Sequence, residues 1–234
     1  LQSSLSCSCY WNQRSFGYSL DNQEELLHDQ EKWIELINRY LKINKGMKVL
    51  DLGCGPGFFS VMLTNLGCQV IGIDYSDNML EEARNNARKF KANVEFQKVD
   101  VQDLAFQDET FDLIITRNVT WNLEKPVQAY QEMVRVLKKQ GHLLNIDGNH
   151  YYYYQDQDYN RAGHRDHQHM EGIDVSIIDN IAKELKLSYV LRPQYDIEIL
   201  KEIGFQQIES EILSKEKTKE GKELIRQFLI HAIK

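Results

Sequence analysis

A glycine cluster and two carboxylates are the residues of this sequence best placed to bind a ligand. Three glycines, Gly53, Gly55 and Gly57, directly follow a short apolar run that contains Asp51. Glycine has no Cβ, so the backbone can turn tightly there and approach a ligand closely. The amides that follow, at the start of a helix, can donate hydrogen bonds to it. A plain strand-to-helix turn also explains the glycines when they are taken alone.

A second acid gives the glycine cluster a more specific meaning. Asp74 closes the next apolar run, 21 positions after Gly53, at the spacing where an acid holds the ribose hydroxyls of a nucleoside. Dinucleotides and S-adenosylmethionine are both bound in this way. The dinucleotide fingerprint requires a small third residue for close helix packing, and the bulky Phe58 stands at that place. We therefore expect a nucleoside ligand without a pyrophosphate.

The elements that must position these residues alternate between strand and helix. Buried parallel strands are short, continuous apolar runs, and helices repeat every 3.6 residues. The terminal segment 224–233 also has helical spacing, so a helix is the alternative there. The predicted strands are 47–52, 70–73, 94–99, 111–116, 142–146, 205–213 and 224–233. The predicted helices are 24–42, 58–66, 77–90, 129–137, 173–187 and 197–203, with Ser76 and Asp196 as caps of two of them.

This order predicts an α/β fold. We expect a Rossmann-like, doubly wound, mainly parallel seven-stranded sheet with an antiparallel C-terminal strand and helices on both faces. Ligands of such sheets bind beyond the carboxyl ends of the strands. Residues 1–22 are expected to form an N-terminal segment, and 23–234 one domain with a lid or substrate insertion at about 149–195. Residues 1–9 lack the pattern of a secretory signal and are left out of the fold prediction.

Five segments occur in an order that is far more specific than any one of them. They are 49–57 (VLDLGCGPG), 72–76 (GIDYS), 99–106 (VDVQDLAF), 111–115 (FDLII) and 136–144 (VLKKQGHLL). The series resembles the class I S-adenosylmethionine-dependent methyltransferases over roughly residues 10–148, and it is most similar to the subgroup with the ubiquinone/menaquinone-type methyltransferases. The sequence Lys139-Gln140-Gly141 departs from the usual proline-glycine turn of that family, in a loop far from the expected site.

The resemblance implies S-adenosyl-L-methionine as the cofactor and a role for each matching residue. Asp51 and the Gly53 backbone should hold the methionine end, and Asp74 the ribose hydroxyls. Each acid also has a structural alternative: Asp51 and Asp74 can cap strand ends, and Asp100 and Asp103 can cap loops. The alternative for Asn118 is a hydrogen bond to the backbone at the strand end. The other implied contacts are Gly55 in the glycine loop, Tyr75 and Met79 beside the adenine, Asp100 to the adenine amino group, the Val101 amide to the adenine ring, and Asn118 at the methionine portion and the substrate mouth.

Aromatic residues precede the first long predicted helix. Tyr10, Trp11 and Tyr18, with Arg14 between them, resemble the W-x-x-R N-terminal segment of many of these methyltransferases, in which a tyrosine closes over the cofactor. The resemblance thus implies a cofactor contact for Tyr18. Aromatic rings also attract a sulfonium ion. The alternative, favoured for Trp11 and open for Tyr18, is that these rings and Phe16 pack the helix onto the sheet.

The stretch 149–172 interrupts the alternation with polar and aromatic residues, including four consecutive tyrosines. Its place after the fifth strand predicts a mobile lid that determines the substrate. Histidine and carboxylate suit zinc or iron, but His164-x-x-His167-x-His169 matches no established spacing, and no metal site is predicted. His150 and a lid tyrosine are candidates for a general base, which is needed only if the acceptor must lose a proton. No catalytic residue is assigned.

Composition limits the classes of partner. The 35 acidic and 28 basic residues give a net charge of −7, so nucleic acid is not an expected partner. No apolar run is long enough to cross a membrane, and no membrane partner is expected. The oligomeric state is not predicted. The four cysteines, Cys7, Cys9, Cys54 and Cys68, form neither zinc-type pairs nor a disulfide framework, which favours a cytoplasmic location.

We therefore expect an S-adenosylmethionine-dependent methyltransferase that acts on a small-molecule substrate by in-line transfer. Its main task is to align the nucleophile, the methyl carbon and the sulfur. The alternatives are a non-catalytic S-adenosylmethionine-binding protein and, with less support, an NAD-linked oxidoreductase. Residues 117–120 (RNVT) lack the NPPY-like tetrad of methyltransferases that act on the amino groups of adenine or glutamine. The motifs cover the cofactor half of the site, so the methyl acceptor is not predicted.

Overall fold

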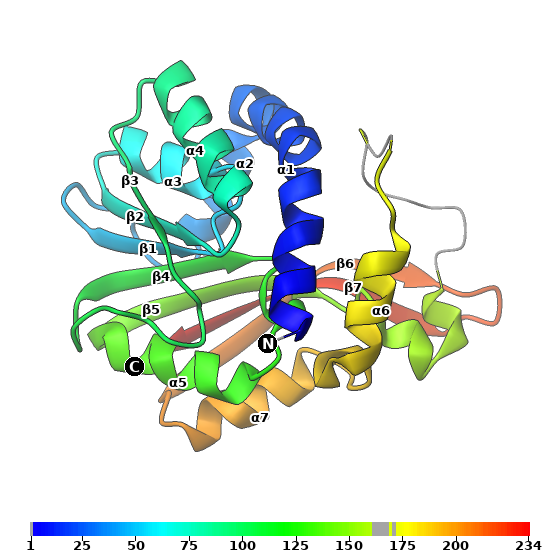
Figure 1. Cartoon of the computed structure of the whole chain (residues 1–234). Coiled ribbons are helices and arrows are strands. Elements are labelled where there is room, and N and C mark those ends of the chain that lie inside the picture. The colour runs from blue at the N-terminus through cyan, green and yellow to red at the C-terminus, as the bar shows by residue number, and fades with distance from the viewer. Residues whose placement is uncertain (1, 161–168, 170–171) are drawn as a thin grey trace.

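The sheet has the predicted topology. A computed structural model describes residues 2–160, 169 and 172–234, and these form a seven-stranded sheet in the order β3-β2-β1-β4-β5-β7-β6 (Figure 1). The strands from β3 to β5 are parallel, whereas β7 is antiparallel to both β5 and β6. The helical alternative for 224–233 is wrong, because this segment pairs on both sides. The strands are β1 (Lys48–Leu52), β2 (Gln69–Asp74), β3 (Glu95–Lys98), β4 (Phe111–Arg117), β5 (Leu137–Gly148), β6 (Gln207–Lys217) and β7 (Glu223–Ile233).

The two central strands explain where a ligand can bind. β1 and β4 are neighbours in the sheet, and nine of their twelve residues are buried. This burial on both faces accounts for their continuous apolar sequence. The chain winds outward from β1 through β2 to β3 and then returns to β4 on the other side. Such a reversal leaves a crevice at the carboxyl ends of the two central strands.

Helices cover both faces of the sheet (Figure 1). α2 (Gln30–Asn38), α3 (Phe58–Asn65) and α4 (Asp77–Lys89) share one hydrophobic core with the strands, and α5 (Pro126–Val136) and α7 (Gln194–Glu202) share the other. α1 (Gln2–His28) packs against α4 and also contacts α6 (Ser176–Glu184). Ser76 caps α4 as predicted, since its hydroxyl oxygen accepts a hydrogen bond from the Met79 amide at 3.1 Å.

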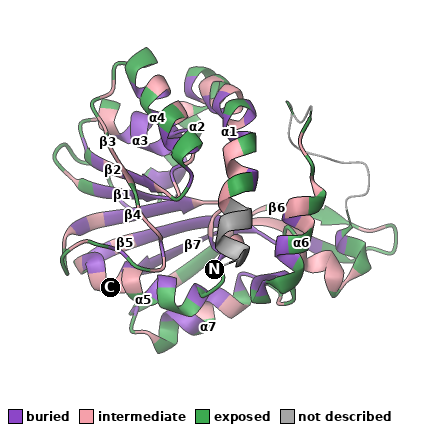
Figure 2. Ribbon diagram, in the orientation of Figure 1, coloured by how far each residue is buried: buried purple, intermediate pink, exposed green. Residues whose placement is uncertain are grey.

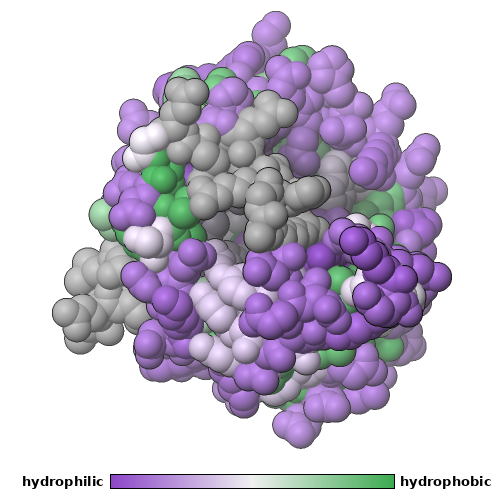
Figure 3. All heavy atoms as spheres, turned by 90° about the vertical axis from the view of Figure 1, so that its right-hand side faces the viewer, coloured by the Kyte–Doolittle hydropathy of each residue, from purple (hydrophilic) through white to green (hydrophobic). Residues whose placement is uncertain are grey.

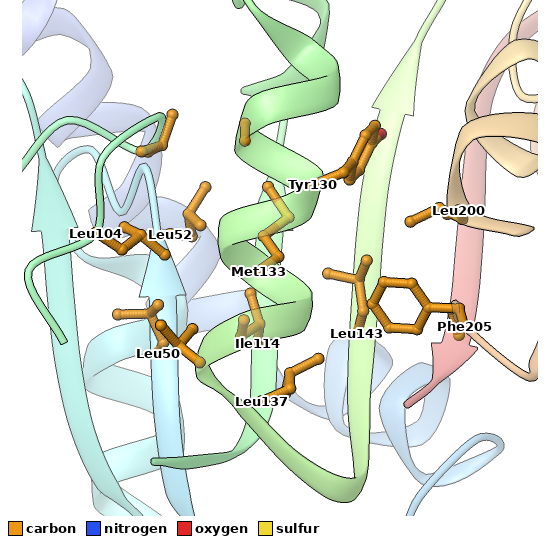
Figure 4. Close-up of a cluster of buried hydrophobic side chains, with 14 of the residues drawn as sticks. Leu50, Leu52, Leu104, Ile114, Tyr130, Met133, Leu137, Leu143, Leu200 and Phe205 are labelled. Atoms are coloured by element: carbon orange, nitrogen blue, oxygen red, sulfur yellow. The ribbon is translucent and has the colours of Figure 1, made fainter. Parts of the chain in front are cut away.

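The core beneath α5 holds the strand ends in place. Leu50, Ile114 and Leu143 come from β1, β4 and β5 and lie against Tyr130 and Met133 of α5 (Figure 4). All five side chains are fully buried, and Figure 2 shows the central strands β1, β4 and β5 as largely buried. A close-packed interior of this kind transmits strain and keeps the loops at its edge in fixed positions.

The N-terminal helices differ from the prediction. α1 extends from Gln2 to His28 and α2 begins at Gln30, so the single helix predicted over 24–42 is wrong. The helix is interrupted at Asp29, whose φ of −116° and ψ of 2° are not helical. The apolar spacing runs across this break because residues of both helices enter the same core. The boundary expected after residue 22 falls inside α1.

A buried ion cluster joins the end of β5 to α7. Arg192 donates to both carboxylate oxygens of Asp196, with Nε–Oδ2 and Nη2–Oδ1 distances of 2.7 Å. Its Nη1 lies 3.1 Å from Asp147 Oδ2 outside hydrogen-bond geometry, so this contact is coulombic. Burial alone would raise the pKa of Asp147, but the Arg192 charge and the His150 hydrogen bond outweigh burial and lower it. The prediction that Asp196 caps its helix is wrong, because Asp196 lies inside α7 and binds Arg192.

The described surface carries scattered apolar residues. Phe16, Leu27 and Ile212 are among the exposed large apolar side chains, and they come from different parts of the fold. The face shown in Figure 3 is mostly hydrophilic, with small separate hydrophobic patches. Within the described ranges, no helix combines the length and the apolar character needed to cross a membrane.

Candidate functional site

A cavity of about 200 Å³ lies at the carboxyl ends of the central strands. The loops after β1, β2, β3 and β4 line it, and α1 and α6 complete its wall. The residues predicted to bind the cofactor come from segments far apart in the sequence, yet all of them line this cavity. They are Tyr18, Asp51, Gly53, Gly55, Asp74, Tyr75, Met79, Asp100, Val101 and Asn118.

The glycine loop has a backbone that only glycine adopts without strain. Gly53, Gly55 and Gly57 have φ values of +68°, +51° and +88°. A Cβ on Gly53 would lie 2.3 Å from Cγ2 of Val119, so this glycine also allows close packing of the β4 loop. A Cβ on Gly55 would meet no described atom within 4 Å, because the residue faces the cavity. The loop is therefore both a structural turn and an open cradle for a ligand.

Asp51 is a buried carboxylate with one oxygen engaged by the protein. Its Oδ2 accepts hydrogen bonds from the Ser60 amide at 2.8 Å and the Ser60 hydroxyl at 2.6 Å. Burial raises the pKa of Asp51 to about 6, although these two hydrogen bonds partly oppose the shift. Capping of the α3 region is thus part of its role, and neither bond uses Oδ1. Since Asp51 lines the cavity, it can also accept from a ligand.

Asp74 fixes the two loops that meet at the end of β2. Its Oδ2 accepts a hydrogen bond from the Gly55 amide at 2.9 Å, and its Oδ1 accepts one from the Ser76 amide at 2.8 Å. Burial raises the pKa of this carboxyl despite these bonds. Each carboxylate oxygen has a second lone-pair site. Asp74 therefore ties the glycine loop to the next helix and still has acceptor sites toward the cavity.

One end of the cavity is suited to a flat ring. Met79 and Val101 are buried there, and Tyr75 is 39% exposed at the rim. Asp100 lies at the same end, where its Oδ1 accepts a hydrogen bond from the Gln102 amide at 2.9 Å. Asp100 thus caps its loop, as the structural alternative stated, and lines the cavity as well.

Asn118 has an unusual backbone and an unused acceptor. Its φ is +57°. Its amide donates to the Ile146 carbonyl at 2.9 Å, and its own carbonyl accepts from the Trp121 indole at 3.0 Å. The backbone is therefore already satisfied. The buried side-chain Oδ1 has no hydrogen-bond partner among the described residues, so it is available to a donor on a ligand.

α1 closes the cavity with aromatic side chains. Tyr18 and Trp11 both line it, and their rings meet edge to face at 5.7 Å. Burial raises the pKa of Tyr18 to about 12, so this hydroxyl stays protonated at neutral pH. Trp11 also packs on Trp121, with ring centroids 6.5 Å apart. Phe16 is 66% exposed, so the alternative that it packs the helix onto the sheet is wrong.

Residues 43–211, more than half of the chain, match the family model described as a methyltransferase domain. The chain belongs to the class I S-adenosylmethionine-dependent methyltransferases. The matched range contains every predicted cofactor residue from Asp51 to Asn118 and ends within β6. Tyr18 and the rest of α1 lie outside it.

Two curated relatives align with about half of this chain. The chain is 33% identical over 120 residues to a demethylmenaquinone methyltransferase of Listeria welshimeri. This alignment covers 50% of the chain and 51% of the relative. The chain is 34% identical over 110 residues to phosphoethanolamine N-methyltransferase 3 of Arabidopsis thaliana, over 46% and 22% of the two chains. A solved structure of Haemonchus contortus phosphoethanolamine N-methyltransferase 2 in complex with S-adenosyl-L-methionine has a TM-score of 0.64, with 19% identity, over 88% and 52% of the two chains. The chain therefore spans about half the length, or less, of these relatives.

The cavity also includes residues that the sequence did not reveal. Arg117 lines it beside Asn118, and two hydrogen bonds of 2.8 Å join its guanidinium to the Glu25 carboxylate. Its Cζ also lies 4.9 Å from the Phe58 ring centroid. The sequence offered one signal for Arg117, which is that it directly precedes the predicted site residue Asn118. The other unpredicted lining residues include Asn22, Gln102, Asn122, Leu123, Glu124, Ile181 and Leu185.

The tyrosine-rich segment after β5 stands behind the cavity wall. None of the described residues 149–160 lines the cavity, whereas Ile181, in the last turn of α6, and Leu185, just after that helix, do. Tyr151 stacks on Trp121 at 5.1 Å, and His150 lies 5.4 Å from the same ring. His150 Nε2 is 3.2 Å from Asp147 Oδ1. Neither candidate base therefore touches the cavity in this conformation.

The histidine cluster is largely outside the described part of the chain. His164 and His167 are not among the described residues, whereas His169 is. Among the side chains that the structure describes, in residues 8–160, 169 and 172–234, no three from His, Cys, Asp or Glu are arranged to hold a metal ion.

Proposed function

We propose that this protein transfers the methyl group of S-adenosyl-L-methionine to a small-molecule acceptor. The observation that carries the proposal is the convergence of the ten sequence-predicted residues on one cavity at the strand ends. Bound S-adenosylmethionine supplies an activated methyl group on sulfur. The residues present fit this cofactor, because Gly55 leaves an open cradle and Asn118 Oδ1 is a buried acceptor without a described partner.

The chain would bind the cofactor in three parts. Asp51, the Gly53 backbone and Asn118 take the methionine end, with Asn118 acting through Oδ1 because Trp121 occupies its carbonyl. The ribose hydroxyls bind Asp74. The adenine lies at the end of the cavity lined by Tyr75, Met79, Asp100 and Val101, and Tyr18 closes over the cofactor from α1.

The protein's contribution to the reaction is alignment and exclusion of water. The strand-end loops hold the cofactor, and the wall formed by Trp11, Leu123, Ile181 and Leu185 confines the acceptor beside it. Holding the two in line converts a bimolecular step into a nearly unimolecular one. The concave, largely apolar lining of this cavity suits a small molecule. The free thiols of Cys9, Cys54 and Cys68 support a cytoplasmic site of action.

Incubation with methyl-labelled S-adenosylmethionine and a metabolite extract tests the proposal. A labelled small product is expected. Binding of S-adenosylhomocysteine without any labelled product would favour a non-catalytic binding protein. A fluorescence change on adding NADH would instead favour an oxidoreductase.

Removal of Asp74 is expected to weaken cofactor binding. The Asp74→Ala variant should lose about 1–3 kcal/mol of S-adenosylhomocysteine affinity, because charge-assisted hydrogen bonds to the ribose are lost. Calorimetry measures the change. Asp77→Ala is the matched control, since Asp77 lies three residues away with a side chain 66% exposed in a surface ion pair with Lys98. Unchanged affinity in Asp74→Ala would contradict the ribose assignment.

Cofactor affinity is also expected to depend on pH through Asp51. The pKa of this carboxyl is about 6, so it is ionised above that pH and protonated below it. Only the ionised form attracts the ammonium group of the methionine end. Affinity for S-adenosylhomocysteine should therefore fall by about tenfold from roughly pH 7.5 to roughly pH 5. Asp51→Asn should bind more weakly at neutral pH and lose most of this dependence; an identical pH profile in the variant would refute the assignment.

A further inference from the structure

A second hollow lies at the end of the sheet opposite the strand-end cavity. Its volume is about 430 Å³, and it is lined by the loop before β1, by the start of β4 and by the first residues of β5. Because β1, β4 and β5 are parallel, these segments meet at the amino ends of the three strands. None of the residues that line this hollow also lines the strand-end cavity.

The charges of the second hollow are not balanced among the described residues. Lys138 donates to Asp112 Oδ1 at 2.7 Å, and the Lys48 amide donates to Asp112 Oδ2 at 2.9 Å. Both carboxylate oxygens of the acidic side chain in the lining are therefore already engaged. Lys45 and Lys139 also line the hollow and form no ion pair with a described carboxylate. Two positive charges thus remain unpaired here, in a chain whose net charge is −7.

Three hydrogen-bonded side chains connect the second hollow to the interior of the sheet. His231 of β7 is buried, and its Nδ1 lies 2.8 Å from a carboxylate oxygen of Glu209 on β6. Its Nε2 lies 2.8 Å from Nδ1 of His142 on β5. An ionised carboxylate only accepts hydrogen bonds, so His231 carries a proton on Nδ1. When neutral, His231 then accepts through Nε2 from the Nδ1 proton of His142, and the other nitrogen of His142 is left unprotonated.

This other nitrogen of His142 is accessible to a ligand. No described group bonds Nε2, and Nε2 is not among the buried polar atoms that lack a partner. Since His142 lines the second hollow, Nε2 is open on that side. One added proton would turn Nε2 into a hydrogen-bond donor. The resulting positive charge is stabilised through His231 by the Glu209 carboxylate.

We propose that the second hollow binds a small dianionic oxyanion group, such as a phosphate group, and takes up one proton from solvent as it binds. Lys45 and Lys139 supply the two unpaired charges. His142, once protonated, donates from Nε2 to an oxygen of the anion, in a charge-assisted hydrogen bond. The site lies at the other end of β1 and β4 from the predicted cofactor residues and does not depend on methyl transfer.

The direction of the pH dependence follows from the surroundings of His142. Burial and the neighbouring His231 lower the pKa of His142, so the ring is neutral at pH 7 in the free protein. A bound anion favours the charged ring and raises this pKa. Affinity for the anion should therefore rise as the pH falls. The other charged or titratable groups that face the histidine pair or line the hollow are Arg39 and Tyr40 after α2, Glu209 and Glu211 of β6, Asp112, Lys45, Lys138 and Lys139.

Histidine NMR during a sulfate titration tests the site. Sulfate is the probe because it has the charge of a phosphate dianion and does not titrate near neutral pH, and chloride keeps the ionic strength constant. The His142 and His231 resonances should shift to saturation. Sulfate should bind about tenfold more tightly at roughly pH 5.5 than at roughly pH 7.5. His142→Gln should lose this pH dependence, and an unchanged dependence in that variant would overturn the proposed proton uptake.

A pair of double variants separates the hollow from the overall charge of the protein. Lys45→Gln/Lys139→Gln should weaken sulfate binding by about tenfold or more. Lys32→Gln/Lys91→Gln is the matched control, because it removes the same charge from two exposed lysines outside the hollow. Its sulfate affinity should equal that of the wild type. Equal weakening in both double variants, or resonance shifts that do not saturate, would indicate an adventitious ion only.

A measurement on the wild type replaces His142→Gln if that variant does not fold. The pKa of His142, read from its own resonances, should rise by about one pH unit at saturating sulfate. No rise in this pKa would overturn the proposal. S-adenosylmethionine takes part in none of these measurements, so failure of the proposed function would leave their outcome unaffected.

Discussion

Arg192→Leu is expected to lower the free energy of unfolding by about 3–5 kcal/mol. The substitution leaves the carboxylates of Asp147 and Asp196 buried without their cation. Both aspartates are essentially inaccessible to solvent. The ionised state of Asp147 depends on the Arg192 charge, which outweighs the effect of burial on its pKa. Denaturant unfolding followed by circular dichroism measures the loss.

Arg39→Leu is the matched control for this experiment. Arg39 also forms an ion pair, with Glu211 at 3.0 Å, but the two side chains are 55% and 34% exposed. Exposed pairs contribute about 0–1 kcal/mol, so this variant should be nearly as stable as the wild type. Similar losses in both variants would show that the buried cluster has no special stabilising role.

Gly55→Val is expected to remove cofactor binding while the fold stays assembled. The Cβ would project into the cavity, where it meets no protein atom but takes the space of the ligand. Affinity for S-adenosylhomocysteine should fall by about 100-fold or more, close to 3 kcal/mol. The φ of +51° adds backbone strain of about 1–2 kcal/mol, which lowers stability modestly.

A control substitution at a second glycine separates the effect of backbone strain from the effect of filling the ligand space. Gly221, in the turn between β6 and β7, has a φ of +88° and no described atom near its added Cβ. Gly221→Val should therefore lower the Tm by a similar amount and leave calorimetric affinity unchanged. If Gly55→Val binds S-adenosylhomocysteine normally, the cofactor lies elsewhere and the glycine loop is only structural.

The sheet and the cavity residues at the strand ends could be predicted because their signals are local. β1 and β4 are buried on both faces and appear in the sequence as continuous apolar runs. Asp51, Asp74 and Asn118 lie at or next to the ends of such runs, so parallel pairing brings them together. Knowledge of which segments are parallel strands is enough to place them at one edge.

The remaining parts depend on contacts between distant segments. Ile181 reaches the cavity only because α6 folds back against α1, and nothing in its local sequence indicates this. Asp196 has the residue type of a helix cap, but its buried carboxylate accepts a hydrogen bond from Arg192 instead. Arg14 has ordinary helical spacing, and its burial becomes evident only when α1 packs in place. The break at Asp29 is hidden for the same reason, since both helices fill one core.

The position of β7 has a consequence for the order of assembly. β7 comes last among the strands, yet it lies between β5 and β6 and forms hydrogen bonds with both. On a ribosome, β6 leaves the exit tunnel before the strand that must separate it from β5. The parallel half of the sheet can pair during synthesis, whereas this edge must wait for residues 223–233. We expect a released chain that is truncated before residue 223 to expose β6 and the unpaired side of β5 to chaperones or to other chains.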